Sequence, residues 1–120
     1  MKDNLLNLIK QIDDIKSHFH VIDTNFTKIN RIHDRPEFSR WKQELVFELD
    51  EIYSRTHDNF IEATLSILNT GFKGTWDEQS FHELAGSLLA IQKNIDKFYQ
   101  EENDSTFKND NKTEGLTKSP

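Results

Sequence analysis

The chain has 120 residues, of which 34% are hydrophobic, and its formal net charge at pH 7 is −6. The length suits a single domain, and the negative charge argues against nonspecific binding of nucleic acid or anionic membranes by the whole surface. The chain has no cysteine, which excludes disulfides and thiolate metal sites.

The first residues do not form the apolar region of a signal peptide, because Asn7, Lys10 and Asp13 interrupt every apolar run there. Later segments are also too short and too polar to span a membrane. We therefore expect a cytoplasmic protein that does not bind membranes.

The first predicted element is an amphipathic helix whose large apolar residues are spaced three and four apart. These residues are Leu5, Leu8, Ile12, Ile15 and Phe19. By default we expect these residues to be buried in the core of the same chain. The alternative is that the helix is an association helix whose apolar residues pack against another chain. Poor helix formers predict a break near residues 20–25, followed by a short helix or an irregular connector to His33. One long first helix is the alternative.

A second helix is predicted to begin at residues 34–37. Asp34 can cap it, Pro36 suits its first turn, and Glu37 completes a capping box. The apolar residues that follow lie on one helical face. They are Phe38, Trp41, Leu45, Leu49 and Ile52. We predict a helix over about 36–54 that is one of two at the centre of the fold.

Two further helices complete the predicted order. Thr56 or Asp58 caps a shorter helix, and Gly71 is suited to the left-handed residue after its end. Residues 75–78 repeat the capping-box pattern ahead of a final helix over about 76–100, the second central one. Its apolar stripe contains Phe81, Leu84, Leu88, Ile91, Ile95 and Phe98.

The composition changes to polar residues after Tyr99, so residues 101–120 are predicted to be a disordered tail. No segment shows convincing period-two alternation, and a sheet is not expected. The predicted fold is therefore all-α: a small antiparallel bundle of about four helices in residues 1–100, with a disordered polar C-terminal tail.

Histidines next to acidic residues suggest one catalytic alternative, a metal-dependent phosphohydrolase. Its candidate residues are His20, His33, Asp34, His57 and Asp58. A metal centre needs these groups to converge, but both His-Asp pairs stand at predicted helix starts, where aspartate is a good cap. We therefore expect no catalytic residue, no metal and no cofactor.

A basic segment over residues 28–42 interrupts the otherwise acidic chain. Its candidate partner-binding residues are Lys28, Arg31, Arg35, Arg40 and Lys42. Such a segment can receive a phosphate, a nucleic acid or an acidic protein. Pairing with the chain's own acidic helices is the commoner outcome on a mixed-sign surface.

The order of elements resembles helical segments attached to effector domains in bacterial defence proteins. The features that carry the resemblance are a leucine-rich first helix, a polar connector, the run Pro36-Glu37-Phe38-x-x-Trp41-Lys42-x-x-x-Leu45, a turn centred on Tyr53, and the final helix from Phe81 to Tyr99. It covers about residues 5–100 and implies an oligomerising or sensing module. Because a polar tail follows in place of an effector domain, it implies a standalone regulator or antagonist, and it transfers no functional residue.

The leading prediction is a noncatalytic helical protein-interaction or regulatory module, bacterial or encoded by a mobile element. It would bind a protein partner or form homo-oligomers. The first alternative is a nucleic-acid or nucleotide-binding regulator that uses the basic segment 28–42. The second is the metal-dependent phosphohydrolase.

Overall fold

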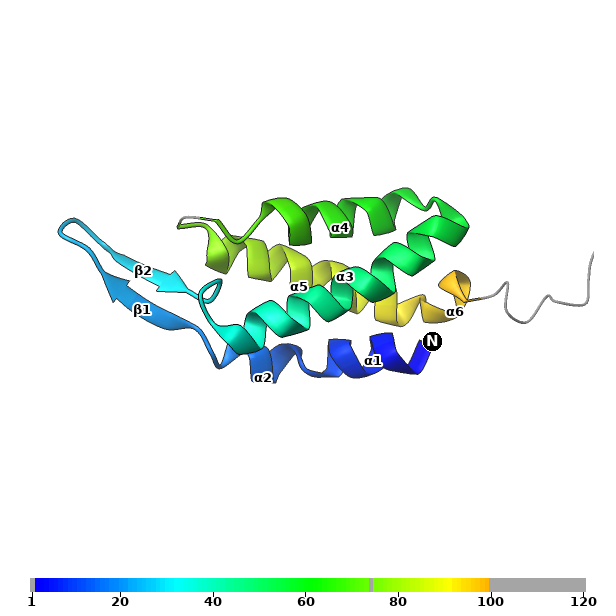
Figure 1. Cartoon of the computed structure of the whole chain (residues 1–120), viewed down its shortest axis with the longest axis horizontal. Coiled ribbons are helices and arrows are strands. Elements are labelled where there is room, and N and C mark those ends of the chain that lie inside the picture. The colour runs from blue at the N-terminus through cyan, green and yellow to red at the C-terminus, as the bar shows by residue number, and fades with distance from the viewer. Residues whose placement is uncertain (1, 74, 100–120) are drawn as a thin grey trace, which may run out of the picture.

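A computed structural model describes residues 2–73 and 75–99 (Figure 1). The predicted tail over residues 101–120 lies outside the described residues. In chain order the elements are helices α1 (Lys2–Lys10) and α2 (Ile12–Lys16), strands β1 (His20–Asp23) and β2 (Lys28–Arg31), and helices α3 (Pro36–Thr56), α4 (Asn59–Thr70), α5 (Asp77–Lys93) and α6 (Ile95–Phe98).

The four longest helices form an antiparallel bundle, in which the chain runs back and forth through α1, α3, α4 and α5 (Figure 1). Helix α3 packs against α1 and α4, and helix α5 packs against the same two helices. The short helix α2 continues along α3. The predicted helical bundle is confirmed, but the all-α class holds only in part, because the chain also contains a small two-stranded sheet.

The core consists largely of the predicted apolar stripes. On α3 all five predicted stripe residues are buried, and on α5 Phe81, Leu84, Leu88 and Ile91 are buried. An aromatic contact joins the two helices, with the ring centroids of Trp41 and Phe81 6.0 Å apart.

The stripe of the proposed association helix also lies in this core. Leu5, Leu8 and Ile15 are buried, and Ile12 and Phe19 are half-buried against the core cluster. The buried members of this stripe, Leu5, Leu8 and Ile15, are therefore not available for a contact with a second chain.

The first helix is interrupted at Gln11, between α1 and α2. The indole of Trp41 on α3 donates a hydrogen bond of 2.8 Å from Nε1 to the backbone carbonyl of Leu8, just before the interruption. The bond is buried, so it links the end of α1 to the middle of the bundle by a polar contact that has no competition from water.

The prediction that no sheet forms is wrong. Strands β1 and β2 pair antiparallel, with His20 opposite Arg31 and Asp23 opposite Lys28. The predicted break near residues 20–25 is confirmed, but a hairpin takes the place of the short helix, the irregular connector and the single long helix.

A tight turn joins the two strands. The backbone N–H of Thr24 donates to the carbonyl of Thr27 at 2.8 Å, and the N–H of Thr27 donates to the hydroxyl of Thr24 at 2.9 Å. The threonine hydroxyl therefore supplies one of the bonds that a turn needs, as is usual for hydroxyl side chains in loops.

The predicted helix ends are confirmed at two places. Pro36 stands in the first turn of α3, and Asp58 caps α4 by accepting from the backbone N–H groups of Phe60 and Ile61. Both capping boxes are wrong, because the N-caps of α3 and α5 are Arg35 and Trp76, and neither makes a side-chain cap bond. Asp34, the predicted cap of α3, and Asp77, in the first turn of α5, instead bond to partners distant in the sequence, as described below.

Two further helix ends differ from the prediction. Gly71 has φ −79°, and the left-handed residue is instead Phe72 (φ 57°), whose buried ring packs 4.6 Å from the ring of Phe38. The final helix is interrupted at Asn94, whose side-chain amide donates to the carbonyl of Ala90. Such a bond to the preceding turn competes with the regular helix ladder.

Replacing the buried indole tests the link between α1 and α3. We expect Trp41→Phe to lower the free energy of unfolding by about 1–3 kcal/mol, because it removes the hydrogen bond to Leu8 and leaves a small cavity. Chemical denaturation measures this change. Trp76→Phe is the matched control, since Trp76 is 65% exposed, and its effect should stay within about 0.5 kcal/mol.

Candidate functional site

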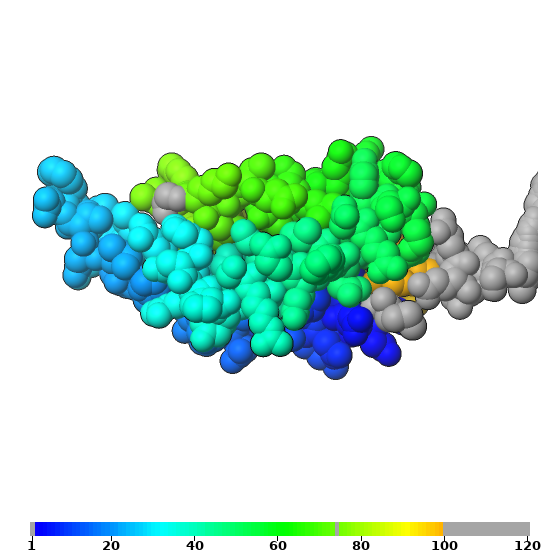
Figure 2. Space-filling view, viewed as in Figure 1, coloured from blue at the N-terminus to red at the C-terminus, as the bar shows by residue number. Residues whose placement is uncertain are grey.

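The hairpin projects beyond the end of the helical bundle (Figures 1 and 2). Its tip carries Phe26, whose side chain is 97% exposed, and β1 carries Val21, which is 60% exposed. Two-stranded hairpins are marginally stable in water when nothing else holds them. The contacts at the base of this hairpin therefore decide whether it keeps a fixed position.

A buried carboxylate attaches the hairpin to the bundle. Asp77, in the first turn of α5, is fully buried, and its Oδ2 accepts from the backbone N–H groups of Ile32 and His33 at 2.8 and 2.7 Å. The imidazole Nδ1 of His33 lies 2.9 Å from the same oxygen and donates to it when protonated there. The helix N-terminus adds a favourable dipole for this negative charge. We call this set of bonds the Asp77 clasp.

A second attachment lies at the start of β1. The ring Nε2 of His20 is 2.8 Å from Oδ1 of Asp34, and this hydrogen bond, together with the charge of nearby Arg31, holds the pKa of Asp34 below its usual range. Arg35 adds a bond from its Nε to the backbone carbonyl of His18 at 3.3 Å. Both ends of the hairpin are therefore bonded at its base.

The five predicted basic residues do not point to one surface. Lys28 and Arg31 are three positions apart on a strand, so their side chains leave on opposite faces. Arg40 and Lys42 are two apart on α3 and face different directions, and Arg40 already pairs with Glu44 at 3.4 Å.

The residues of the phosphohydrolase alternative also separate. His20 and Asp34 lie at the hairpin base, and His33 bonds to Asp77 there. His57 and Asp58 lie at the far end of α3, a helix of 21 residues that spans about 31 Å. Among residues 2–73 and 75–99 no three histidines or acids are grouped so that they could hold a metal ion.

A concave site, which we call the base pocket, lies between α2 and α5 where the hairpin begins. Its volume is about 430 Å³. Phe19 and Phe81 form an aromatic floor, with ring centroids 5.4 Å apart and an interplanar angle of 89°. The other lining residues are Ile12, Asp13, Lys16, Asn30, Glu78, His82, Ala85 and Leu89.

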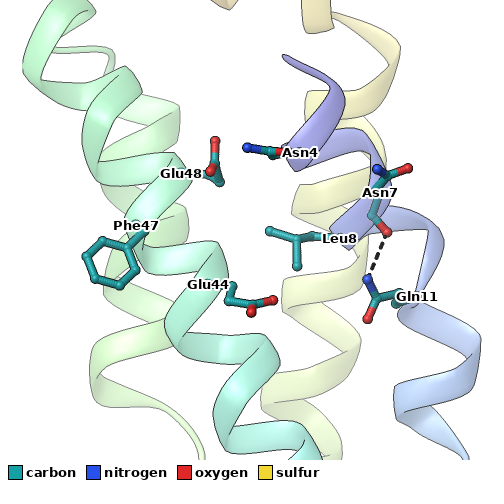
Figure 3. A pocket seen from close by; sticks show the side chains of 7 residues that line it. All are labelled: Asn4, Asn7, Leu8, Gln11, Glu44, Phe47 and Glu48. Carbon is teal, nitrogen blue, oxygen red and sulfur yellow. Dashed lines mark hydrogen bonds between the residues drawn. The ribbon is translucent and has the colours of Figure 1, made fainter. Parts of the chain in front are cut away.

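A second groove, also of about 430 Å³, lies between α1 and α3 (Figure 3). Glu44 and Glu48 extend from α3 toward α1, whereas the ring of Phe47 points away from the groove. Asn4, Asn7, Leu8 and Gln11 complete the lining. This groove is polar, and it brings together no nucleophile with a base that could activate it.

Sequence reasoning missed the hairpin, Phe26 and the base pocket. One usable signal was present: the apolar pair Val21-Ile22 and the single apolar residue Ile29 flank the turn-forming residues Thr24 and Asn25, as apolar residues do in short hairpins.

Comparisons with protein-family models, with curated proteins and with solved structures found no match to this chain. The resemblance to segments of bacterial defence proteins therefore stays a prediction. Within the described part of the chain, no helix combines the length and apolar character needed to cross a membrane. The functional argument depends on the geometry of the hairpin and its base.

The Asp77 clasp can be tested by a nearly isosteric change. We expect Asp77→Asn to lower the free energy of unfolding by about 2–4 kcal/mol, because a neutral amide replaces a buried carboxylate that accepts three bonds. Hydrogen exchange at the amides of Ile32 and His33 should accelerate most. Asp96→Asn is the control, since Asp96 is exposed, and a loss of equal size there would contradict the assignment.

The pair at the start of β1 makes a pH-dependent contribution. Because the folded-state pKa of Asp34 is lowered, the interaction stabilises the fold above the usual aspartate range, and this contribution is lost as pH falls through the folded-state pKa. We expect His20→Ala to raise the pKa of Asp34 toward its ordinary range, measured by NMR titration of the carboxyl carbon. His82→Ala should leave the Asp34 titration unchanged.

Proposed function

We propose that the chain is a noncatalytic protein-interaction module whose contact element is the projecting hairpin. The observation that carries the proposal is the 97% exposure of Phe26 at the tip of an arm that stands beyond the bundle. Aromatic residues are enriched among the side chains that dominate binding energy in protein interfaces.

The attachment of the arm supports this role. Contacts at both ends of the hairpin, the Asp77 clasp and the His20–Asp34 pair, fix its position on the bundle. A contact element that is already ordered loses little conformational freedom on binding, so more of the contact energy appears as affinity. Trp76, the N-cap residue of α5 and the neighbour of Asp77 in the chain, is a second large apolar side chain that is exposed.

The two alternatives receive less support from the geometry. Nucleic-acid binding requires basic side chains that follow the phosphate backbone on one surface, and those of residues 28–42 diverge. Phosphohydrolase chemistry requires metal ligands that converge, and its candidate residues are distributed between both ends of α3.

Site-specific photocross-linking tests the proposal. A benzophenone amino acid replaces Phe26 in the full chain, and cross-linked products are analysed from cells that produce the protein. We expect a discrete adduct with a protein, and we expect its yield to depend on the aromatic position at the hairpin tip.

Position 60 provides the control for that experiment, because Phe60 is a partly exposed phenylalanine on α4. Equal adduct patterns from positions 26 and 60, or no adduct from position 26, would contradict the hairpin as the contact element.

A further inference from the structure

The base pocket is a concave site that no side chain of the described residues 2–73 and 75–99 fills. Its volume of about 430 Å³ lies in the range of ligand pockets, and its lining combines apolar side chains, among them Phe19 and Phe81, with an equal number of polar or charged ones. Leu89, which also lines the pocket, is 53% exposed. The pocket therefore offers apolar area that a partner could cover.

The hairpin of the same chain cannot fill this pocket. Asn30, near the base of β2, lines the pocket, whereas Phe26 lies at the opposite end of the hairpin. Strands of four residues extend about 13 Å, so the tip and the base are separated by that length. The exposed aromatic side chain and the pocket can meet only between two chains.

We propose that the base pocket binds Phe26 from the hairpin of a second copy of this chain, and that the second copy's pocket receives Phe26 of the first. This inference rests on the proposed function and names the partner. Two hairpins that lie antiparallel place each tip at the base of the other. The arrangement is a two-fold dimer that closes on itself, which is the commonest symmetry of homo-oligomers.

Charges at the tip and at the rim are complementary. The tip presents Asp23 and Lys28, which lie opposite each other in the strand register. On α2 the rim carries Asp13 and Lys16, so each charge at the tip has an opposite charge within the same rim. On α5 the rim also carries Glu78, which accepts a bond from Asn30 at 3.3 Å.

Each copy carries a net charge of −6, so two copies repel each other electrostatically over most of their surface. Local pairing of opposite charges at the rim would offset part of this repulsion, and it would favour one orientation of the hairpin in the pocket. An apolar contact of Phe26 alone would not favour one orientation of the hairpin over another.

The test is the absolute mass of the full chain by sedimentation equilibrium over a range of concentrations. Phe26→Ser removes the aromatic side chain, Ala85→Arg blocks the pocket, and Phe60→Ser is the control. We expect a reversible dimer for the wild-type chain and for Phe60→Ser. For each of the other two variants the dissociation constant should rise at least about a hundredfold, since both reciprocal contacts lose an anchor worth about tenfold or more.

Mixing the two weakened variants provides a result that misfolding cannot produce. Phe26→Ser retains an intact pocket and Ala85→Arg retains an intact tip, so their mixture can form one of the two contacts. We expect mixed dimers that are weaker than the wild-type dimer but stronger than the dimer of either variant. Circular dichroism checks that both variants keep the helical content of the wild-type chain.

Three results would overturn the inference: a wild-type monomer at all concentrations, a dimer that survives Ala85→Arg, or no mixed dimer. The cross-link from position 26 distinguishes failure of the dimer inference from failure of the proposed protein-interaction function. An adduct with base-pocket residues of another copy supports the inference, whereas an adduct with a different protein supports only the proposed function. Absence of any adduct contradicts both.

Discussion

The position of the hairpin depends on one buried carboxylate. Asp77 belongs to α5, yet its side chain bonds to the backbone of Ile32, 45 residues earlier, where β2 leaves the hairpin. The strands contribute little apolar burial of their own, since every one of their eight residues is exposed or half-buried. Hydrogen bonds of the Asp77 clasp therefore hold the hairpin on the bundle, whereas apolar packing holds the helices together. A buried carboxylate of this kind is stable only while its hydrogen-bond partners remain in place.

The part of the fold that long helices provide could be predicted from the sequence. Helix α3 has 21 residues, so its apolar stripe repeats over several turns and identifies the buried face. The hairpin could not be recognised in the same way, because neither strand alternates apolar and polar residues: β1 places Val21 and Ile22 side by side, and β2 has one apolar residue, Ile29. The β-branched residues Val21 and Ile22 are poor helix formers, so the sequence indicates only a break in the helix at this point.

The candidate site was harder to predict because its contacts are long-range. Asp34 and Asp77 each stand near a helix start, where sequence patterns indicate capping, but each accepts from a partner that the local sequence does not identify. The basic residues of segment 28–42 illustrate the opposite limit of sequence patterns. They are close in the sequence, but strand alternation and helix periodicity turn their side chains apart.

Energetics explain why association would use the hairpin and would be weak. Most large apolar side chains of the helices are buried in the core of the bundle. The side chain of Phe26, in contrast, loses almost none of its accessible surface within its own chain. Full burial of one phenylalanine contributes about 1.5–3 kcal/mol, so two reciprocal contacts contribute about 3–6 kcal/mol. A micromolar complex requires about 8 kcal/mol. The remainder must come from Leu89 and the charged rim, and a dimer of this kind would therefore respond to protein concentration and to salt.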